Sequence, residues 1–266
     1  MKKQNKNLLL LIDYQNDFCN PEGSLFVPGS VEDTERISKF IRENISVIDH
    51  IILTADFHQI INISHPYFWI NQNSQHPEPF TQITYKDILE KKWIPVIFKE
   101  EALKYIQNLE KQGEFVHTIW PEHCIAGTEG AAIVNNVMQA VVKWARQGFL
   151  FDLILKGQNP LTEHFGAIRA NIPIKNDPST KINRRLVEKL KHFKNIIIAG
   201  EAKTHCVANT IKQIYEIKSL KSNVYLLDDC TSPVPGYDHI ADNIYKNALA
   251  KGLKIVKSND NSFLYF

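Results

Sequence analysis

The chain has few cysteines, no long apolar run and almost no net charge. Its four cysteines lie at positions 19, 124, 206 and 230 of 266 residues, and no two form a C-x-x-C pair. This spacing argues against a disulfide framework and favours the reducing cytoplasm. The apolar run Leu8 to Ile12 stops at Asp13, which is too short for a signal peptide or a membrane span. A net charge of +2, from 31 basic and 29 acidic residues, gives no electrostatic basis for binding nucleic acid.

Short apolar runs alternate with helical patterns along the sequence. The runs that predict buried strands cover residues 8–12, 51–54, 115–119, 149–155, 196–199 and 224–227. Helical periodicity predicts helices near 30–48, 101–111, 133–145, 183–193, 207–215 and 238–251. The alternation predicts a single α/β domain over residues 1–266, a doubly wound, mostly parallel six-stranded sheet with helices on both faces. Two polar stretches that contain proline, about 60–98 and 157–180, are expected to be long functional loops.

A chemically capable side chain follows each of the first five predicted strands. Ligands bind at the carboxyl ends of the strands in such sheets, so we expect these side chains to lie together. Taken singly, each has an ordinary structural role, since an aspartate usually caps a turn and a lone cysteine is usually a small buried residue. Their shared position favours a reaction centre. These residues are Asp13, Asp56 with His58, His123, Lys156 and Cys206.

Two chemical groups can be drawn from this set. One carboxylate and two imidazoles, from Asp56, His58 and His123, suit Zn²⁺ or another first-row divalent ion. In the other group, Cys206 is the candidate nucleophile. A helix start and Lys156 are both expected to lower its thiol pKa. Asp13 would take the thiol proton and later deliver it to a leaving amine.

Six segments occur in an order that is typical of one enzyme family. They are LLLIDYQNDFC, TADFH, IWPEHC, LKG, GEAKTHCV and LLDDCTSPVPG. Together they resemble the isochorismatase-like cysteine hydrolases, and nicotinamidases most closely, over nearly the whole chain. The resemblance implies the isochorismatase-like hydrolase fold and a metal-dependent amidase for NAD salvage. Such an enzyme converts nicotinamide to nicotinate and ammonia through a thioester.

The resemblance also implies roles for individual residues. It assigns the catalytic triad to Asp13, Lys156 and Cys206, and the metal ligands to Asp56, His58 and His123, with Zn²⁺ expected and Fe²⁺ or Mn²⁺ as alternatives.

The substrate side of the site follows from the same resemblance. Phe18 and Trp120 would sandwich the substrate ring, and the N–H groups of Ala202 and Cys206 would bind the oxyanion. A cis peptide bond is implied between Glu201 and Ala202.

The sequence departs from the family pattern at one candidate metal ligand. Many nicotinamidases carry a histidine where this chain has Asn62, and a histidine appears at position 65 instead. His65 is therefore either a further ligand or a hydrogen-bonded loop histidine. We expect Glu163 and His164 to anchor the second loop, and His205 to be a wall or surface group because neighbours at a helix start point in different directions.

Alternative functions remain at this stage. The main alternative is a related cysteine amidohydrolase that acts on another small amide or carbamoyl compound. A catalytically silent binding module of the same fold is a further alternative. A true isochorismatase is disfavoured because those enzymes lack the cysteine. The expected partner is a small-molecule amide, with no nucleic acid and no membrane, and edge strands make a homo-oligomer plausible.

Overall fold

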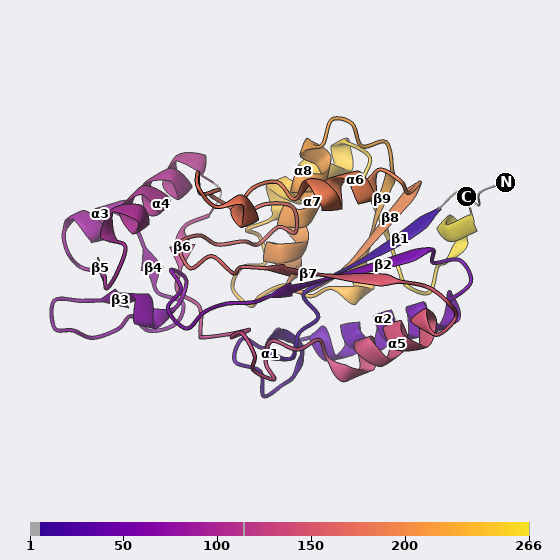
Figure 1. Ribbon diagram of the computed structural model, residues 1–266, viewed down its shortest axis with the longest axis horizontal. Coiled ribbons are helices and arrows are strands. Elements are labelled where there is room, and N and C mark those ends of the chain that lie inside the picture. The colour runs from indigo at the N-terminus through magenta and orange to yellow at the C-terminus, as the bar shows by residue number, and fades with distance from the viewer. Residues whose placement is uncertain (1–5, 114, 266) are drawn as a thin grey trace.

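Six parallel strands form the central sheet of the computed structural model, which describes residues 6–113 and 115–265 (Figure 1). The strand order is β10-β9-β8-β1-β2-β7. The chain builds outward from β1 through β2 to β7, and then outward on the other side of β1 through β8 and β9 to β10. The doubly wound sheet is thus confirmed, and its order reverses beside β1, where ligands bind in such folds. The strands are β1 (Asn7–Ile12), β2 (His50–Asp56), β7 (Phe151–Lys156), β8 (Asn195–Gly200), β9 (Asn223–Leu227) and β10 (Lys254–Val256).

Helices cover both faces of the sheet (Figure 1). Helices α2 (Ser30–Glu43) and α5 (Asn135–Ala145) pack together on one face. The other face is covered by α6 (Arg184–Leu190), α7 (Ala208–Glu216) and α8 (Asp242–Ala250). Both faces of β1 are therefore buried, which explains its continuous apolar sequence in place of an alternating one.

Side chains of β1 divide between the two layers by their period of two. Leu9 and Leu11 belong to the core under α2 and α5, whereas Leu8, Leu10 and Ile12 belong to the core under the other three helices. Each such side chain contributes about 1.5–3 kcal/mol when it is fully buried. This burial holds the end of β1, and the residue after it, in a fixed position.

One of the six predicted strands is wrong, and one strand was missed. The run 115–119 does not join the central sheet. Its middle forms β6 (His117–Thr118), which pairs antiparallel with β4 (Gln82–Ile83) in a separate small sheet. The sixth strand of the central sheet is instead β10, three residues long and mostly exposed. An apolar run in the sequence indicates that a segment is buried, but not which strand it pairs with. The three mostly exposed residues of β10 are too few to show the hydrophobic periodicity of a strand.

The predicted loop at 60–98 contains several short elements. Together with α4 it forms a lobe, residues 60–113 and 115–119, that lies beyond the carboxyl end of β1 (Figure 1). The lobe has its own apolar cluster, in which Phe68, Trp69 and Ile106 are fully buried. Its elements are the 3₁₀ turn Pro66–Phe68, β3 (Trp69–Ile70), β4, α3 (Tyr85–Leu89), β5 (Ile94–Pro95), α4 (Lys99–Gln112) and β6.

Shorter turns complete the described chain. The second predicted loop, 157–180, contains a single 3₁₀ turn and no longer helix or strand. None of the helices in residues 6–113 and 115–265 combines the length and apolarity needed to cross a membrane. The remaining elements are α1 (Asn16–Cys19), a π-helical turn (Lys203–Val207) and 3₁₀ turns at Pro178–Thr180, Asp228–Cys230 and Ser262–Tyr265.

Candidate active site

The amine of Lys156 contacts three other side chains that the sequence predicted for the site. Its Nζ lies 2.7 Å from Asp13 Oδ2, 2.6 Å from Asp56 Oδ1 and 3.5 Å from Cys206 Sγ. These residues sit at the ends of β1, β2 and β7 and just after β8, four strands that are neighbours in the sheet. All four are buried. The expected convergence at the carboxyl edge is therefore observed for them.

His123 reaches the site by another route. The prediction that His123 follows a strand of the central sheet is wrong, because β6 belongs to the lobe. Backbone contacts hold its segment instead. The N–H of His58 donates to the carbonyl of Cys124, and Ile125 forms a parallel bridge with His58.

Asp13 occupies a constrained backbone position. Its φ is +48°, in the left-handed region that non-glycine residues rarely adopt, a feature that clusters at functional sites. The hydroxyl of Thr54 donates to Asp13 Oδ1 at 2.6 Å. Burial raises the pKa of Asp13, and Lys156 opposes that shift without cancelling it. The carboxyl can thus hold a proton more readily than an exposed aspartate.

Burial alone would lower the pKa of Lys156. The two carboxylates, Asp13 and Asp56, reverse this effect and raise the pKa well above its ordinary value. Lys156 is therefore a permanent cation between two acids and the thiol.

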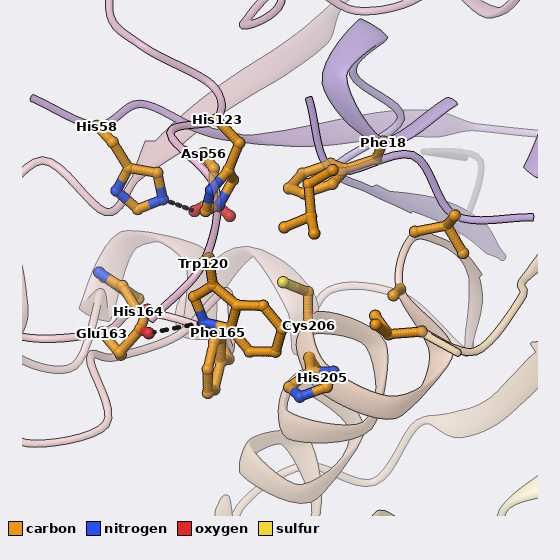
Figure 2. A pocket seen from close by; sticks show the side chains of 14 residues that line it. Phe18, Asp56, His58, Trp120, His123, Glu163, His164, Phe165, His205 and Cys206 are labelled. Atoms are coloured by element: carbon orange, nitrogen blue, oxygen red, sulfur yellow. Dashed lines mark hydrogen bonds and ion pairs between the residues drawn. The ribbon is translucent and has the colours of Figure 1, made fainter. Parts of the chain in front are cut away.

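Cys206 lies inside the π-helical turn that precedes α7 and lines a buried pocket (Figure 2). Burial raises the pKa of its thiol well above the ordinary value, and Asp13 and Asp56 add to the shift against the effect of Lys156. The expectation of a lowered thiol pKa is therefore wrong, because burial beside two acids outweighs one cation. The thiol needs a base, and ligand atoms of Asp13, Asp56 and Cys206 all lie within 4.8 Å of one another.

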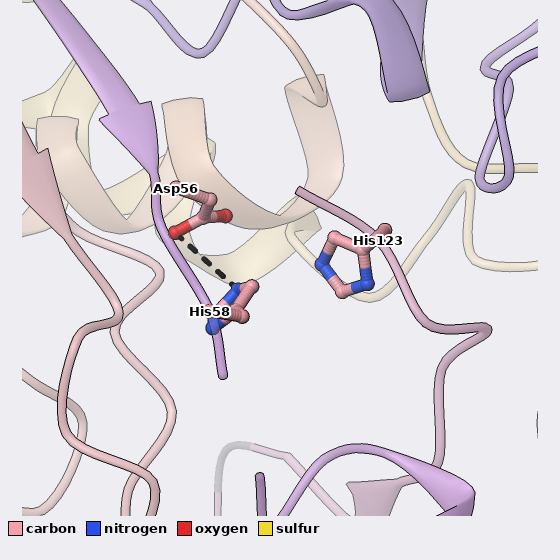
Figure 3. A group of neighbouring side chains, drawn as sticks. All are labelled: Asp56, His58 and His123. Atoms are coloured by element: carbon pink, nitrogen blue, oxygen red, sulfur yellow. Dashed lines mark ion pairs between the residues drawn. The ribbon is translucent and has the colours of Figure 1, made fainter. Parts of the chain in front are cut away.

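Asp56, His58 and His123 form a compact group (Figure 3). One ligand atom from each lies within 4.8 Å of the other two, and Asp56 Oδ1 is 3.7 Å from His58 Nε2. His58 Nδ1 donates to the Gly157 carbonyl at 3.1 Å, and His123 Nδ1 donates to the Pro121 carbonyl at 2.8 Å. Such bonds fix the imidazole tautomer and leave Nε2 as the ligand atom. The set therefore fits a divalent metal ion.

The charge states of His123 and Asp56 suit cation binding. His58 differs, because Asp56 outweighs the effect of burial and raises the pKa of its ring. Burial lowers the pKa of His123 to about 4, so its ring is neutral at pH 7. Although burial favours the neutral acid, Lys156 and then His58 bring the pKa of Asp56 below its ordinary range. A neutral imidazole and an ionised carboxylate are the forms that bind metal.

His65 is a third imidazole beside this group. It is fully buried, and its ring centroid lies 5.4 Å from that of His58 and 5.2 Å from that of His123. Neither ring nitrogen makes a well-aligned hydrogen bond to the described residues, although carbonyls of Gln59 and Ile60 lie near. His65 is therefore not a fully hydrogen-bonded loop histidine, and it stands outside the compact group of three ligands.

Two residues of the segment LLLIDYQNDFC, for which no role was predicted from the sequence, hold the site together. The Gln15 amide donates to the Asp56 carbonyl and accepts from the Asp56 N–H, both at 2.7 Å. Asp17 Oδ2 accepts from the N–H of Cys124 at 2.6 Å and so fixes the segment that carries His123. Their spacing from Asp13 was visible in the sequence, but their partners were not.

The pocket has aromatic walls (Figure 2). Both predicted ring-binding residues, Phe18 and Trp120, line it, and so does His205, which we expected to be a wall or surface group. Glu163 was expected only to anchor its loop. Instead it enters the pocket, where its Oε1 accepts from Trp120 Nε1 at 3.1 Å, and burial raises its pKa to about 7.

The turn before Cys206 contributes a backbone wall. Ala202 lines the pocket, and the peptide bond between Glu201 and Ala202 is cis, as the resemblance implied. Within residues 6–113 and 115–265, the Ala202 amide donates no hydrogen bond. Its N–H group is therefore free to bind an oxygen in the pocket.

Comparison with known proteins agrees with this geometry. No protein-family model matches the sequence. The chain is 26% identical over 252 residues to the nicotinamidase of Saccharomyces cerevisiae, with 93% of this chain and 98% of the relative covered. The solved structure of the yeast nicotinamidase, also known bound to the inhibitor nicotinaldehyde, superposes with a TM-score of 0.66 and 23% identity over 94% of this chain and 99% of that one.

A more distant structure shares the fold as well. The pyrazinamidase of Pyrococcus horikoshii, solved in complex with zinc, superposes with a TM-score of 0.57 and 19% identity over 95% of this chain and 99% of that chain. In sequence and in fold, this chain is therefore a nicotinamidase-like protein with the isochorismatase-like hydrolase fold.

Proposed function

We propose that the chain is a cysteine amidohydrolase that converts nicotinamide to nicotinate and ammonia. The observation that carries this proposal is the position of the Lys156 amine, which touches Asp13, Asp56 and Cys206 at once. A nucleophile, a base and a metal-binding carboxylate thus share one buried cation at the end of an aromatic pocket. The similarity to a nicotinamidase supports nicotinamide as the amide.

The first half-reaction begins with the Cys206 thiol. Asp13 takes its proton, and the sulfur attacks the carboxamide carbon of a ring held between Phe18 and Trp120. The oxyanion that forms faces the N–H groups of Ala202 and Cys206. Asp13 then returns the proton to the amide nitrogen, the C–N bond breaks, and ammonia leaves a thioester on Cys206.

The second half-reaction restores the thiol. Asp13 removes a proton from water, the hydroxide attacks the thioester carbonyl, and nicotinate is released as sulfur regains a proton. Lys156 keeps Asp13 oriented in both steps. The raised pKa of Asp13 suits this work, because the carboxyl must hold the proton between its two transfers.

Asp56, His58 and His123 would hold one divalent metal ion, with Zn²⁺ as the first candidate and Fe²⁺ or Mn²⁺ as alternatives. Such an ion would supply a Lewis acid for the ring nitrogen of nicotinamide. The chain's own contribution is to orient the imidazoles, as the carbonyls of Gly157 and Pro121 do.

A related cysteine amidohydrolase with another small amide substrate is the second candidate. The ionisable Glu163 in the pocket favours it, since this carboxyl could bind a polar substituent that nicotinamide lacks. A silent binding module is disfavoured, because a ligand cavity alone has no need for a buried thiol beside a base. We place either enzyme in the cytoplasm, where its free thiol would stay reduced.

Ammonia release from nicotinamide and from a panel of small amides tests the proposal. We expect turnover of nicotinamide that a metal chelator abolishes and added Zn²⁺ restores. If only another amide is hydrolysed, the proposed substrate is wrong but the proposed cysteine amidohydrolase chemistry stands. If no amide is selectively hydrolysed, the catalytically silent binding module becomes the favoured function.

A further inference from the structure

A buried carboxyl group lies behind the turn that precedes Cys206. Glu201 directly follows β8, and its side chain is fully buried. It is not among the residues that line the substrate pocket. Its Oε2 accepts from the N–H of Ser232 at 3.2 Å, and the hydroxyl of the same serine donates to Asp33, so the two carboxyls flank one residue. The other oxygen of Glu201, Oε1, is buried and has no hydrogen-bond partner within residues 6–113 and 115–265.

Two other groups already hold Asp33. Its Oδ1 is 2.6 Å from Arg36 Nη2, and its Oδ2 accepts from the hydroxyl of Ser232 at 2.5 Å. Arg36 is the cation of this cluster, and it is partly exposed. If Glu201 and Asp33 were both ionised, two buried anions would share this one cation. Two neighbouring buried carboxyl groups with a single cation between them therefore hold one proton.

Charged and titratable groups face Glu201 from every element around it. From α2 these are Asp33 and Arg36, and the others cannot supply a second cation at neutral pH because they are phenols and a thiol. These others are Tyr14 and Cys19 from the segment after β1, and Tyr245 from α8. Burial first, and then Asp33, raise the pKa of Glu201 well above its ordinary value.

The partner of this carboxyl connects it to the pocket. The Ser232 carbonyl accepts from the N–H of Lys203 at 2.8 Å. Two residues further on, the N–H of Val234 donates to Thr204 Oγ1 at 3.2 Å. Both Ala202 and Val234 line the pocket, so the carboxyl ties together two of its walls.

We propose that Glu201 is a positioning residue that acts as a neutral carboxylic acid. Its O–H donates to the Asp33 carboxylate, its carbonyl oxygen accepts from Ser232, and the two bonds fix the turn that carries Ala202 and Cys206. Loss of this proton at alkaline pH places a second anion beside Asp33 and loosens the turn. The kinetic consequence rests on the proposed amidase function, but the consequence for stability does not.

Stability against pH tests the neutral carboxyl directly. Glu201→Gln keeps an acceptor for Ser232 and a donor for Asp33 but cannot ionise. The folded-state pKa of Glu201 is raised above the ordinary 4.5, so the stability that this one carboxyl contributes is lost as pH rises from about 4.5 through the folded value. Thermal unfolding between pH 6 and pH 9 should show the variant gaining at least about 3 °C on the wild type.

The matched control is Glu188→Gln, which changes an exposed glutamate on α6 and should follow the wild-type curve. Parallel curves for Glu201→Gln and the wild type would overturn the proposal, because the side chain would then not be a buried, protonated acid.

Kinetics test the positioning role. At pH 7 the kcat of Glu201→Gln for nicotinamide should stay within about twofold of wild type, and it should fall less than wild type towards pH 9. Glu201→Leu leaves the Ser232 N–H without a partner, so kcat should fall at least about tenfold with little change in KM.

Equal kcat losses in the glutamine and leucine variants would refute the positioning role, because the conservative change must rescue it. If the wild-type protein does not hydrolyse nicotinamide at all, the proposed function fails, and the stability curves still decide the state of Glu201.

Discussion

Lys156 Nζ and Asp56 Oδ1 lie 2.6 Å apart and join the thiol group to the metal-binding group. The same Oδ1 lies 3.7 Å from His58 Nε2, so one carboxylate oxygen faces both the ammonium and a metal-binding imidazole. The same ammonium holds Asp13 at 2.7 Å. One buried lysine thus aligns the base and one metal ligand without occupying the pocket.

Replacing Lys156 by methionine should destabilise the fold as well as abolish amide hydrolysis. The change leaves Asp13 and Asp56 buried without their cation, and removal of one partner from a buried ion pair costs about 3–5 kcal/mol. Denaturant unfolding at pH 7 measures it. As a control, Lys189→Met removes the partly exposed partner of Asp152, which should cost at most about 1 kcal/mol. Equal losses in the two variants would contradict a buried, charged Lys156.

Cys206→Ala should reduce ammonia release at least about 1,000-fold while nicotinamide binding survives, because loss of a nucleophile removes the covalent route. The control is Cys230→Ala, a buried thiol that is not among the residues lining the pocket. If the Cys206 variant retains turnover, another group performs the attack.

Asp56→Asn and His123→Asn should each lower bound metal at least about tenfold, measured as metal per chain after dialysis. Either change removes one of three converging ligands. His239→Asn changes an exposed histidine and should keep full metal content. If both ligand variants keep the wild-type amount of metal per chain, the ion binds at another site.

Glu163→Leu should raise KM for nicotinamide about tenfold with a smaller effect on kcat. The leucine leaves the buried Trp120 N–H unpaired and frees a wall of the pocket. Glu163→Gln keeps an acceptor for that N–H and should retain a near wild-type KM. A wild-type KM in the leucine variant would show that this bond does not orient the ring.

The protein should lose stability as the pH falls from 6.5 towards 4. Burial lowers the pKa of His117 and of His205 to about 4, so both rings must take up a proton on unfolding near pH 5. Because the folded-state pKa of each ring is lower than the unfolded-state pKa of 6.5, the stability that the neutral rings contribute is complete above pH 6.5 and is lost as the pH falls. Each ring accounts for about 2 kcal/mol at pH 5.

Urea unfolding at pH 7.5 and pH 5 measures this loss. His117→Gln should reduce the difference between the two pH values, whereas His239→Gln should leave it unchanged. An identical difference in all three proteins would mean that His117 is protonated in the folded state.

Local sequence located the strand ends that bear the chemistry. A continuous apolar run that ends at Asp13 or Asp56 signals a strand buried on both faces, and the polar residue at its end must lie at the edge of the sheet. The strand before Lys156 is a partly exposed edge strand with Asp152 inside it, so its end was located by alternation with helices alone. The same signal failed for 115–119, because apolar residues of the lobe look like those of the sheet.

The sequence by itself determined the fold class and the residues that meet, since burial periodicity and strand-end position are local properties. Only the tertiary structure decided the charge states of these residues and the hydrogen-bond partners that hold them in place. Lys156 reaches two acids and a thiol that lie 50 to 143 positions away along the chain, and burial beside those acids raises the pKa of Cys206 where an exposed helix start would lower it. Gln15, Asp17, Glu163 and Glu201 acquire their roles in the same way, from partners that no local pattern encodes. Desolvation and electrostatic interactions depend on residues that are distant in the sequence and near in the fold, so the local spacing of residues does not predict them.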